Sequence, residues 1–378
     1  MMTASDGLHF ARRIRTSPYF SRLESHGVTG YSVYNHMLLP KSFGASLEDD
    51  YWHLNSHVQI WDVSVQRQVE ITGPDAARLV QWITPRDLKN AVHGRCYYIP
   101  VVDATGGIIN DPVMLRLADD RFWLSIADSD LLLYLKGLAT GSGLDVAIDE
   151  PDVNPLAIQG PKAIDLAVDL FGPQIAELGF FHFTHVDIFG TRQLVSRSGF
   201  SSQAGIEIYL NDPQLAEPLW DLIWQAGQPY HIRPGAPNLI DRIEAGLLGY
   251  GNEMTRANNP LEMGYGKFCT LDGSIDCIGL AALQQVAATG PDRVIRGVRF
   301  DGAPCPSCHI PWPMTVDGTF AGNITSAVWS PRFDANIGLG LVERGYWTIG
   351  QMVDVSLPDG RHATGKVCGL PFAEQTTA

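Results

Sequence analysis

Two carboxylates stand inside apolar segments of the sequence, where an acidic side chain is uncommon. Asp111 follows a Gly-Gly turn in the stretch GGIINDPV, and Glu207 separates two isoleucines in the stretch GIEIYL. A carboxylate in such a place can accept hydrogen bonds from a ligand or hold a proton during a reaction. The same patterns also fit an exposed turn for Asp111 and a solvated strand face for Glu207. From the spacing alone, both interpretations stay open.

Arg242 is the third candidate for a functional site. It lies in the segment NLIDRIEAGLLGYG, which predicts a helix that ends at the glycines 249–251. On such a helix, an arginine either caps or covers the surface, or supplies a cation to a buried acid.

Three motifs resemble haem, nucleotide or metal sites but lack the rest of the pattern. Cys305-Pro-Ser-Cys308-His309 has haem-attachment spacing, yet we expect no export signal and find no second cysteine pair at zinc spacing. The stretch 360–366 fits G-x-x-x-x-G-K, but Val367 stands where a phosphate loop needs Ser or Thr. His53 and His57 have the i, i+4 spacing without the adjacent glutamate of a zinc protease. We therefore predict no metal site.

Two successive blocks of mixed strands and helices are predicted to position the candidate residues. The first has strands at 57–72, 95–102, 108–115 and 122–127, and helices from 76 to Pro85 and over 131–140. The second has a strand and a helix within 157–172, strands up to residue 210, and a helix over 213–227. Beyond about residue 292 the chain is rich in Gly and Pro with short strands, which predicts an all-β C-terminal domain.

Composition limits the class of protein. The chain has 378 residues, of which 45% are hydrophobic, enough for two or three packed domains. Its net charge of −14 argues against nucleic acid or an anionic membrane as a partner. No stretch of 18 uncharged apolar residues occurs, and the N-terminal twenty residues lack the apolar region of a signal peptide. We therefore expect a cytoplasmic protein.

Several longer strings follow one another in a recognisable order. These strings are YSVYNHMLLP, VQIWDVSVQRQVEI, GRCYYIPVVD, GGIINDPV, LSIADSDLLLY, SRSGF…GIEIYL, RIEAGLLGYGNEM and NNPLEMGYGKF. Their succession, from about residue 25 to 372, resembles the glycine-cleavage T-protein (aminomethyltransferase) family of tetrahydrofolate-dependent enzymes. Within that family they look closest to the dimethylsulfoniopropionate (DMSP) demethylase branch.

The resemblance implies an α+β, three-domain fold around a central folate channel. The fold would consist of two αβ domains followed by a C-terminal β-barrel or jelly-roll-like domain. We expect the first αβ domain to be split over 1–50 and 153–250, and the second to span 51–152 with part of 251–285. The β-rich domain would span 286–378.

The resemblance also implies roles for the candidate residues. Tetrahydrofolate would be the methyl acceptor, with Asp111 near its N5 atom as the catalytic residue. Glu207, Tyr209 and Arg242 would join Asp111 in binding the folate, with Arg242 as a partner of Asp111. The methyl donor would be DMSP, or alternatively another small S-, N- or O-methyl compound, and aminomethyl transfer is a further alternative.

A sulfonium donor needs little acid catalysis, because it leaves as a neutral thioether. It favours aromatic faces through cation–π attraction, and we expect Tyr31, Tyr34 and Phe200 to supply them. Phe200 and Ser202 stand where the demethylase branch is expected to have Trp and Lys. This loop therefore lacks the Trp ring that could bind a cation and the Lys that could bind an anion in the branch pattern. A homodimer is one assembly that the sequence leaves open.

Overall fold

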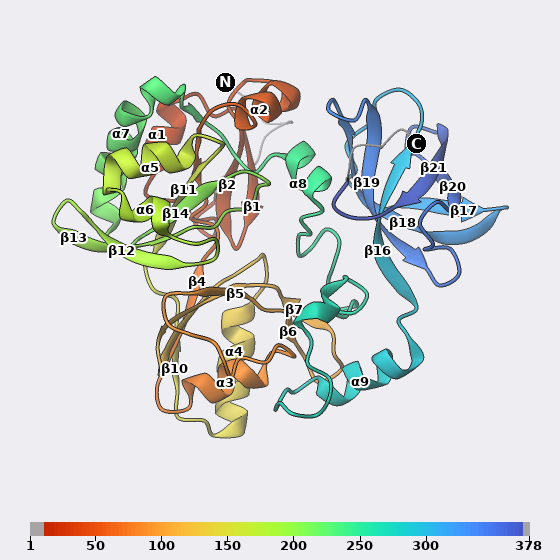
Figure 1. Ribbon diagram of the computed structural model, residues 1–378, viewed down its shortest axis with the longest axis horizontal. Helices are drawn as coiled ribbons and strands as arrows, with labels where there is room; N and C mark the ends of the chain where they lie inside the picture. The colour runs from red at the N-terminus through yellow and green to blue at the C-terminus, as the bar shows by residue number, and fades with distance from the viewer. Residues whose placement is uncertain (1–10, 373–378) are drawn as a thin grey trace.

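The computed structural model describes residues 11–372 as three units arranged around a common centre (Figure 1). The first unit contains a six-stranded sheet, the second a five-stranded sheet, and the third a closed six-stranded barrel. This arrangement confirms the predicted α+β class with a C-terminal barrel. None of the helices that the structure describes is long and apolar enough to cross a membrane.

The sheet of the first unit has the order β12-β13-β14-β11-β3-β15. All neighbouring pairs are antiparallel except β15 and β3, which run parallel. Its strands are β3 (Gln59–Asp62), β11 (Asn154–Gln159), β12 (Phe183–Ile188), β13 (Thr191–Ser196), β14 (Gly205–Leu210) and β15 (Arg233–Pro234). The same unit carries the hairpin of β1 (Gly30–Tyr34) and β2 (Met37–Ser42).

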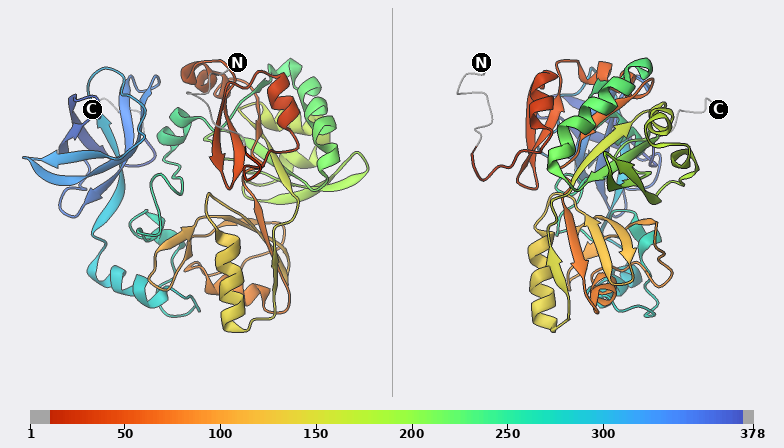
Figure 2. Two further views of the ribbon diagram at one scale, coloured as in Figure 1. Left: turned by 180° about the vertical axis from the view of Figure 1, so that it is seen from behind. Right: turned by 90° about the vertical axis from the view of Figure 1, so that its left-hand side faces the viewer.

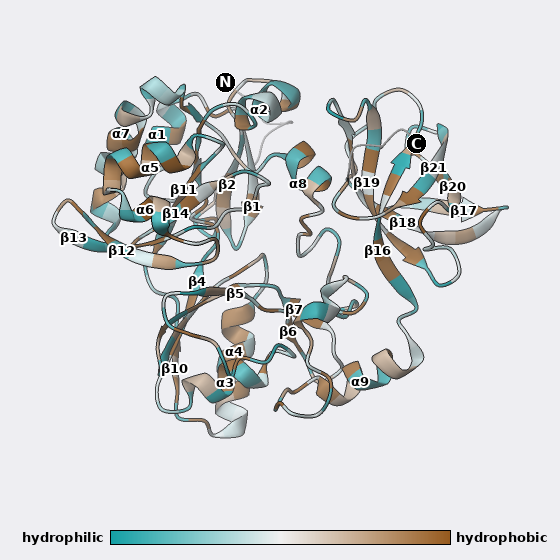
Figure 3. Ribbon diagram, in the orientation of Figure 1, coloured by the Kyte–Doolittle hydropathy of each residue, from teal (hydrophilic) through white to brown (hydrophobic). Residues whose placement is uncertain are grey.

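Helices pack on one face of this sheet and build the first core. They are α1 (Phe20–Ser25), α5 (Ala163–Phe171), α6 (Gln174–Glu177) and α7 (Ala216–Ala226), with α2 (Leu47–Leu54) nearer the third unit. Hydrophobic and hydrophilic residues alternate along α5 and α7 (Figure 3), as expected for helices with one buried face. Ile206 and Ile208 of β14 point into this core. Because side chains alternate along a strand, Glu207 and Tyr209 must point to the opposite face.

The second unit has the sheet order β10-β4-β9-β8-β5. The strands are β4 (Gln68–Thr72), β5 (Cys96–Tyr98), β8 (Val113–Ala118), β9 (Arg121–Ser125) and β10 (Ala147–Asp149). Helices α3 (Ala76–Trp82) and α4 (Leu131–Ser142) cover it, and β6 (Val101–Val102) pairs with β7 (Ile108–Asn110) beside it. α3 ends at Trp82, three residues before the predicted stop at Pro85.

A connecting segment runs between the units to the barrel. It contains α8 (Leu239–Ala245), a 3-10 turn at Tyr265–Phe268 and α9 (Leu280–Thr289). The prediction that the helix of Arg242 continues to the glycines 249–251 is wrong: Gly246 has a φ of 68°, which ends α8 in the left-handed conformation that glycine favours.

The barrel has the order β16-β19-β18-β17-β20-β21 and is closed. Its strands are β16 (Arg293–Phe300), β17 (Trp312–Val316), β18 (Thr319–Ser330), β19 (Ala335–Glu343), β20 (Met352–Ser356) and β21 (His362–Cys368). The G-x-x-x-x-G-K stretch begins in the β20–β21 hairpin turn and continues along β21, so it has no helix to follow it as a phosphate loop requires.

One strand pairs outside the domain to which the sequence assigns it. β3 lies within the range 51–152 but pairs in the first sheet, between β11 and β15. The other boundaries between domains remain a prediction.

Candidate functional site

Asp111 stands directly after β7, and the chain around it is tightly held. Gly106 has a φ of 80°, and a Cβ on Gly107 would come within 2.4 Å of the carbonyl oxygen of Arg256. The turn before β7 therefore needs both glycines. The Asn110 side chain donates to the Ala127 carbonyl at 3.0 Å and accepts from the Ala127 N–H at 3.0 Å. These two hydrogen bonds with the backbone of one residue fix the segment from which Asp111 projects.

The Asp111 carboxylate has one satisfied oxygen and one free oxygen. Its Oδ2 accepts a hydrogen bond of 2.8 Å from the Tyr98 hydroxyl. Its Oδ1 is buried and has no hydrogen-bond partner among residues 11–372. Burial raises the pKa of Asp111 to about 7, and the nearby negative charge of Glu253 adds to the rise. The carboxyl group can therefore exchange a proton near neutral pH, and Oδ1 can accept a hydrogen bond from a ligand.

Tyrosines surround this carboxylate. The rings of Tyr98 and Tyr265 meet edge to face, 5.2 Å between centroids. Burial, and after it the charge of Asp111, raise the pKa of Tyr34, Tyr265 and Tyr250. These phenols therefore stay neutral at any physiological pH. They offer hydroxyl donors and aromatic faces beside a carboxylate, which is a suitable environment for a cationic group.

Glu207 is a buried acceptor on the sheet face that points away from the first core. Its Oε2 accepts hydrogen bonds from the Ser198 hydroxyl and, at 3.5 Å, from the Tyr209 hydroxyl. Burial raises the pKa of Glu207. The Tyr209 ring lies 6.1 Å from that of Trp123, on β9 of the second unit. Glu207 therefore sits on the side of the first sheet that faces the second unit.

Arg242 forms a buried ion pair with Glu253 rather than with Asp111. Its guanidinium donates to Glu253 at 2.7 Å, to the Ser326 hydroxyl at 2.8 Å and to the Leu247 carbonyl at 3.0 Å. The side chains of Arg242 and Glu253 are 8% and 0% exposed. The expectation that Arg242 is the direct partner of Asp111 is therefore wrong, because Glu253 takes its ionic contact. Glu253 in turn lies close enough to Asp111 to affect its pKa.

The aromatics predicted from the sequence lie in different places. The charge of Asp111 raises the pKa of Tyr34, after a larger effect of burial. Tyr31 lies elsewhere: its hydroxyl donates to Glu24 at 2.6 Å, and its ring stacks on Phe20 at 5.8 Å. It packs against the core of the first unit. The structure therefore does not group Tyr31 with Tyr34.

Phe200 lies in a half-buried loop that is tied to α8. In this loop the Ser202 N–H donates to Asp241 at 2.8 Å, and the Ser202 hydroxyl also donates to Asp241. Asp241 neighbours Arg242 in the sequence, so the loop is connected to the same helix as the Arg242–Glu253 pair.

Tyr98, Tyr250, Glu253 and Tyr265 were not singled out from the sequence. Their signal was present, since they lie in the strings GRCYYIPVVD, RIEAGLLGYGNEM and NNPLEMGYGKF that carry the family resemblance. No spacing rule connects them, because they come from strand β5, a loop and a 3-10 turn that meet only in the fold.

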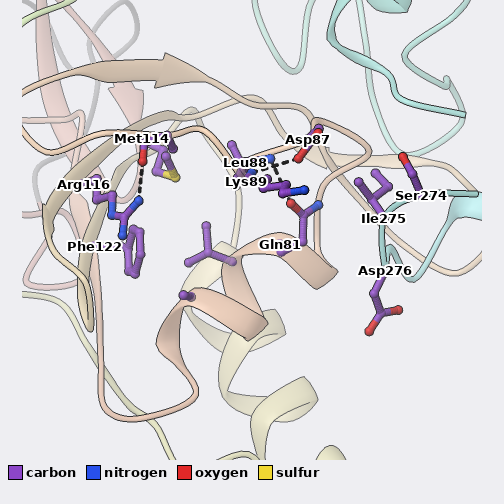
Figure 4. Close-up of a pocket in the computed structure, with 13 residues that line it drawn as sticks. Gln81, Asp87, Leu88, Lys89, Met114, Arg116, Phe122, Ser274, Ile275 and Asp276 are labelled. Atoms are coloured by element: carbon purple, nitrogen blue, oxygen red, sulfur yellow. Dashed lines mark hydrogen bonds between the residues drawn. The ribbon is translucent and has the colours of Figure 1, made fainter.

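A cavity of about 490 Å³ lies in the second unit, apart from these residues. Val80, Met114 and Phe122 form apolar parts of its wall, and Lys89 and Arg116 line it as well (Figure 4). Neither Asp111, Glu207 nor Arg242 lines this cavity.

Family models cover almost all of the described chain. The model for the GCVT N-terminal domain matches residues 19–273, and the model for the glycine cleavage T-protein C-terminal barrel domain matches residues 293–374. The chain belongs to the glycine cleavage T-protein family. The resemblance inferred from the motifs is thereby confirmed.

Two relatives show where the chain lies within the family. It is 47% identical over 350 residues to a protein of Ruegeria pomeroyi named dimethylsulfoniopropionate demethylase, covering 93% of this chain and 95% of the relative. It is 31% identical over 309 residues to an aminomethyltransferase of Alkaliphilus metalliredigens, covering 80% and 83%. The chain is thus more similar to the demethylase than to this aminomethyltransferase.

A solved structure supports the fold independently. The aminomethyltransferase T of the Bartonella henselae glycine cleavage system superposes with a TM-score of 0.86, covering 96% of this chain and 99% of that one. The sequence identity is 23%, so this similarity concerns the family fold.

Proposed function

We propose that this protein moves the S-methyl group of DMSP to N5 of tetrahydrofolate. The products are 5-methyltetrahydrofolate, 3-(methylthio)propionate and a proton. The observation that carries the proposal is the 47% identity, over nearly the full length of both chains, to a protein named DMSP demethylase. The site geometry supports it, because a carboxylate with a free oxygen stands among neutral tyrosines.

The residues present fit a reduced pterin. The hydrogen bonds from the Ser198 and Tyr209 hydroxyls both go to Oε2 of Glu207, so its Oε1 can serve as an acceptor for ring N–H groups. Asp111 offers the orphaned Oδ1 as a second acceptor. Glu207 would hold the pterin edge, while Asp111 would face the reacting nitrogen. Tetrahydrofolate supplies a nucleophilic nitrogen to which the methyl group is transferred.

The transfer needs little covalent help from the protein. The nitrogen–carbon bond forms as the carbon–sulfur bond breaks, and the bonding electron pair stays on sulfur as a neutral thioether. The only proton released is the one on N5. Asp111, with a pKa near 7, can take that proton at the working pH. Catalysis is then mostly the alignment of two bound molecules.

Tyrosine faces supply the cation site. Tyr98 donates to Asp111, Tyr265 packs edge to face on Tyr98, and burial and the charge of Asp111 raise the pKa of Tyr34, so all three phenols remain uncharged. Their ring faces would bind the sulfonium through cation–π attraction, without forming a tight ion pair with it. In this arrangement Tyr31 plays no part in donor binding, because it packs on the first core instead.

The direct test is one reaction with the full chain, tetrahydrofolate and DMSP carrying deuterated methyl groups. We expect labelled 5-methyltetrahydrofolate and 3-(methylthio)propionate in equal amounts, with neither formed when folate is omitted. Equal formation of thioether without folate would refute the folate step. Turnover of an N- or O-methyl donor but not of DMSP would refute the donor. Turnover only of an aminomethylated lipoyl carrier would assign the chain to aminomethyl transfer.

Location and assembly remain separate from this reaction. A cytoplasmic location and a homodimer are predictions from the sequence, to be checked by fractionation and by light scattering of the purified protein.

A further inference from the structure

Arg86 is a cation near the candidate site that forms no ion pair with any of residues 11–372. The acidic neighbour Asp87 is engaged elsewhere: its carboxylate accepts a hydrogen bond from the Lys89 N–H at 2.8 Å, and its side chain lies at the cavity of the second unit (Figure 4). The chain carries a net charge of −14, so carboxylates are abundant on it. An arginine that pairs with none of them is available to an anionic ligand.

Two aromatic rings hold the guanidinium of Arg86 in place. It lies 5.3 Å from the ring centroid of Tyr97, on β5, and 4.9 Å from that of Phe268, in the connecting segment. In Figure 2, as in Figure 1, this segment lies beside the second unit, and the Thr270 N–H donates to the Pro85 carbonyl at 2.8 Å. The position of Arg86 is therefore fixed by contacts from both the sheet and the connecting segment.

A single residue, Tyr98, separates Arg86 from Asp111. Its carbonyl accepts a hydrogen bond from Nη1 of Arg86 at 2.6 Å, and its hydroxyl donates to Asp111 at 2.8 Å. Its ring lies 5.3 Å from that of Phe268 and 5.2 Å from that of Tyr265. The guanidinium and the Asp111 carboxylate are thus bound to opposite ends of one tyrosine.

Most of the hydrogen-bonding capacity of Arg86 is unused. A guanidinium has five N–H donors, and the hydrogen bond to the Tyr98 carbonyl uses only Nη1. Nε and Nη2 remain, and together they form the planar fork that matches the two oxygens of a carboxylate.

Two further cations surround the same rings. Arg95 lies 5.5 Å from the Tyr97 ring centroid, and Lys267 lies 5.0 Å from that of Phe268. Both residues are exposed. Arg86 is the one of the three that is half-buried and bonded to Tyr98, so it is placed to contact a ligand. The other two would raise the positive potential that attracts an anion to this end of the site.

We propose that Arg86 binds the propionate carboxylate of the methyl donor through Nε and Nη2. This inference rests on the proposed function, under which the sulfonium lies at Asp111 and the tyrosines. Only two methylene groups join the sulfur of DMSP to its carboxylate, so the carboxylate must lie close to the reacting centre. The glutamate of folate lies farther from N5, beyond the aminobenzoyl group. A cation one tyrosine away from Asp111 therefore fits the donor.

The test compares Arg86→Met with Arg86→Lys and uses Arg299→Met as the matched control. Arg299 has the same kinds of contact in the barrel: it donates to the Phe333 carbonyl at 2.6 Å and lies 6.0 Å from the ring centroid of Phe333. Calorimetry measures the binding of four probes, each added alone. They are DMSP, its amide analogue 3-(dimethylsulfonio)propanamide, tetrahydrofolate, and tetrahydropterin without glutamate.

We expect Arg86→Met to weaken DMSP binding by about tenfold or more, since a charge-assisted hydrogen bond is worth a factor of roughly 10 to 100 in affinity. The amide analogue and both pterins should bind as they do to the wild type. Arg86→Lys keeps the charge and should lose less, and Arg299→Met should match the wild type for every probe. In turnover, Arg86→Met should raise KM for DMSP with little change in kcat, because the carboxylate is held equally before and during methyl transfer.

Three results would overturn the inference. One is that Arg86→Met binds DMSP as tightly as the wild type. Another is that it weakens DMSP and the amide analogue equally, which would indicate a structural role through Tyr98. The third is that it weakens tetrahydrofolate but not tetrahydropterin, which would assign Arg86 to the glutamate of folate.

Failure of the proposed function would give a different result. A wild-type protein that binds DMSP but forms no 5-methyltetrahydrofolate would refute the methyl transfer, while the comparison of DMSP with its amide analogue would still decide the role of Arg86. A wild type that binds no DMSP at all would refute both.

Discussion

Asp111→Asn should stabilise the protein at alkaline pH while impairing its reaction. Burial raises the pKa of this carboxyl from an ordinary 3.8 to about 7. The folded protein then holds the proton more tightly than the unfolded chain, so stability falls as pH rises from about 4 to about 7 and is constant above. At 1.36 kcal/mol per pKa unit, the ionised group costs at most about 4 kcal/mol.

The asparagine variant cannot ionise, so it avoids this cost. Because the Asp111 residue is partly exposed, we take half of the upper limit, about 2 kcal/mol, as the expected gain at pH 8. For a chain of this length the entropy of unfolding is about 0.8 kcal/mol per kelvin, so Tm should rise by about 2–3 °C. Near pH 4 the wild type and the variant should unfold at nearly the same temperature.

The assay is thermal unfolding of the wild type and the variant at pH 4, 6 and 8. Asp276→Asn is the matched control, since it makes the same chemical change at an exposed carboxylate, and its Tm difference should not vary with pH. A variant no more stable than the wild type at pH 8 would refute the reasoning. So would a Tm difference between variant and wild type that is the same at all three pH values.

Three further substitutions probe the rest of the site. Glu207→Gln should weaken tetrahydrofolate binding by about tenfold in calorimetry, since an amide presents only one acceptor oxygen; unchanged affinity would exclude Glu207 from the folate site. Tyr98→Phe removes the hydrogen bond that lowers the pKa of Asp111, so the acidic limb of the kcat profile should move to higher pH, and a fixed limb would show that another group titrates. Arg242→Met leaves Glu253 buried and unpaired, which should cost about 3–5 kcal/mol in denaturant unfolding; if so, adding Glu253→Gln should recover part of the loss.

Strand periodicity accounts for much of what the sequence predicted at the first sheet. The alternation around β14 correctly places Ile206 and Ile208 in the core, and Glu207 on the other face. The same rule could have separated Tyr31 from Tyr34. Three positions apart on one strand, they point to opposite faces, and of the two only Tyr34 has its pKa raised by the charge of Asp111.

Local sequence patterns could not predict the contacts between distant segments. Nothing in the helix of Arg242 shows that its partner would be Glu253, eleven residues later in a loop, rather than Asp111. The pairing depends on how the connecting segment turns at Gly246 and folds back. Tyr98 and Tyr265 meet only because β5 and the 3-10 turn converge. Such encounters follow from tertiary packing, which a single sequence does not encode in any short spacing.

The hydrogen bond from Arg242 to Ser326 has a consequence for how the family can diversify. Ser326 belongs to the barrel, whereas Arg242 and Glu253 belong to the segment that precedes it, and Ser326 also donates to Glu253. A chimera that takes its barrel from a relative lacking a hydroxyl at this position would leave the buried Arg242–Glu253 pair without its hydrogen bonds to Ser326. Recombination between family members at the barrel boundary should therefore yield poorly folded proteins unless all three positions are inherited together.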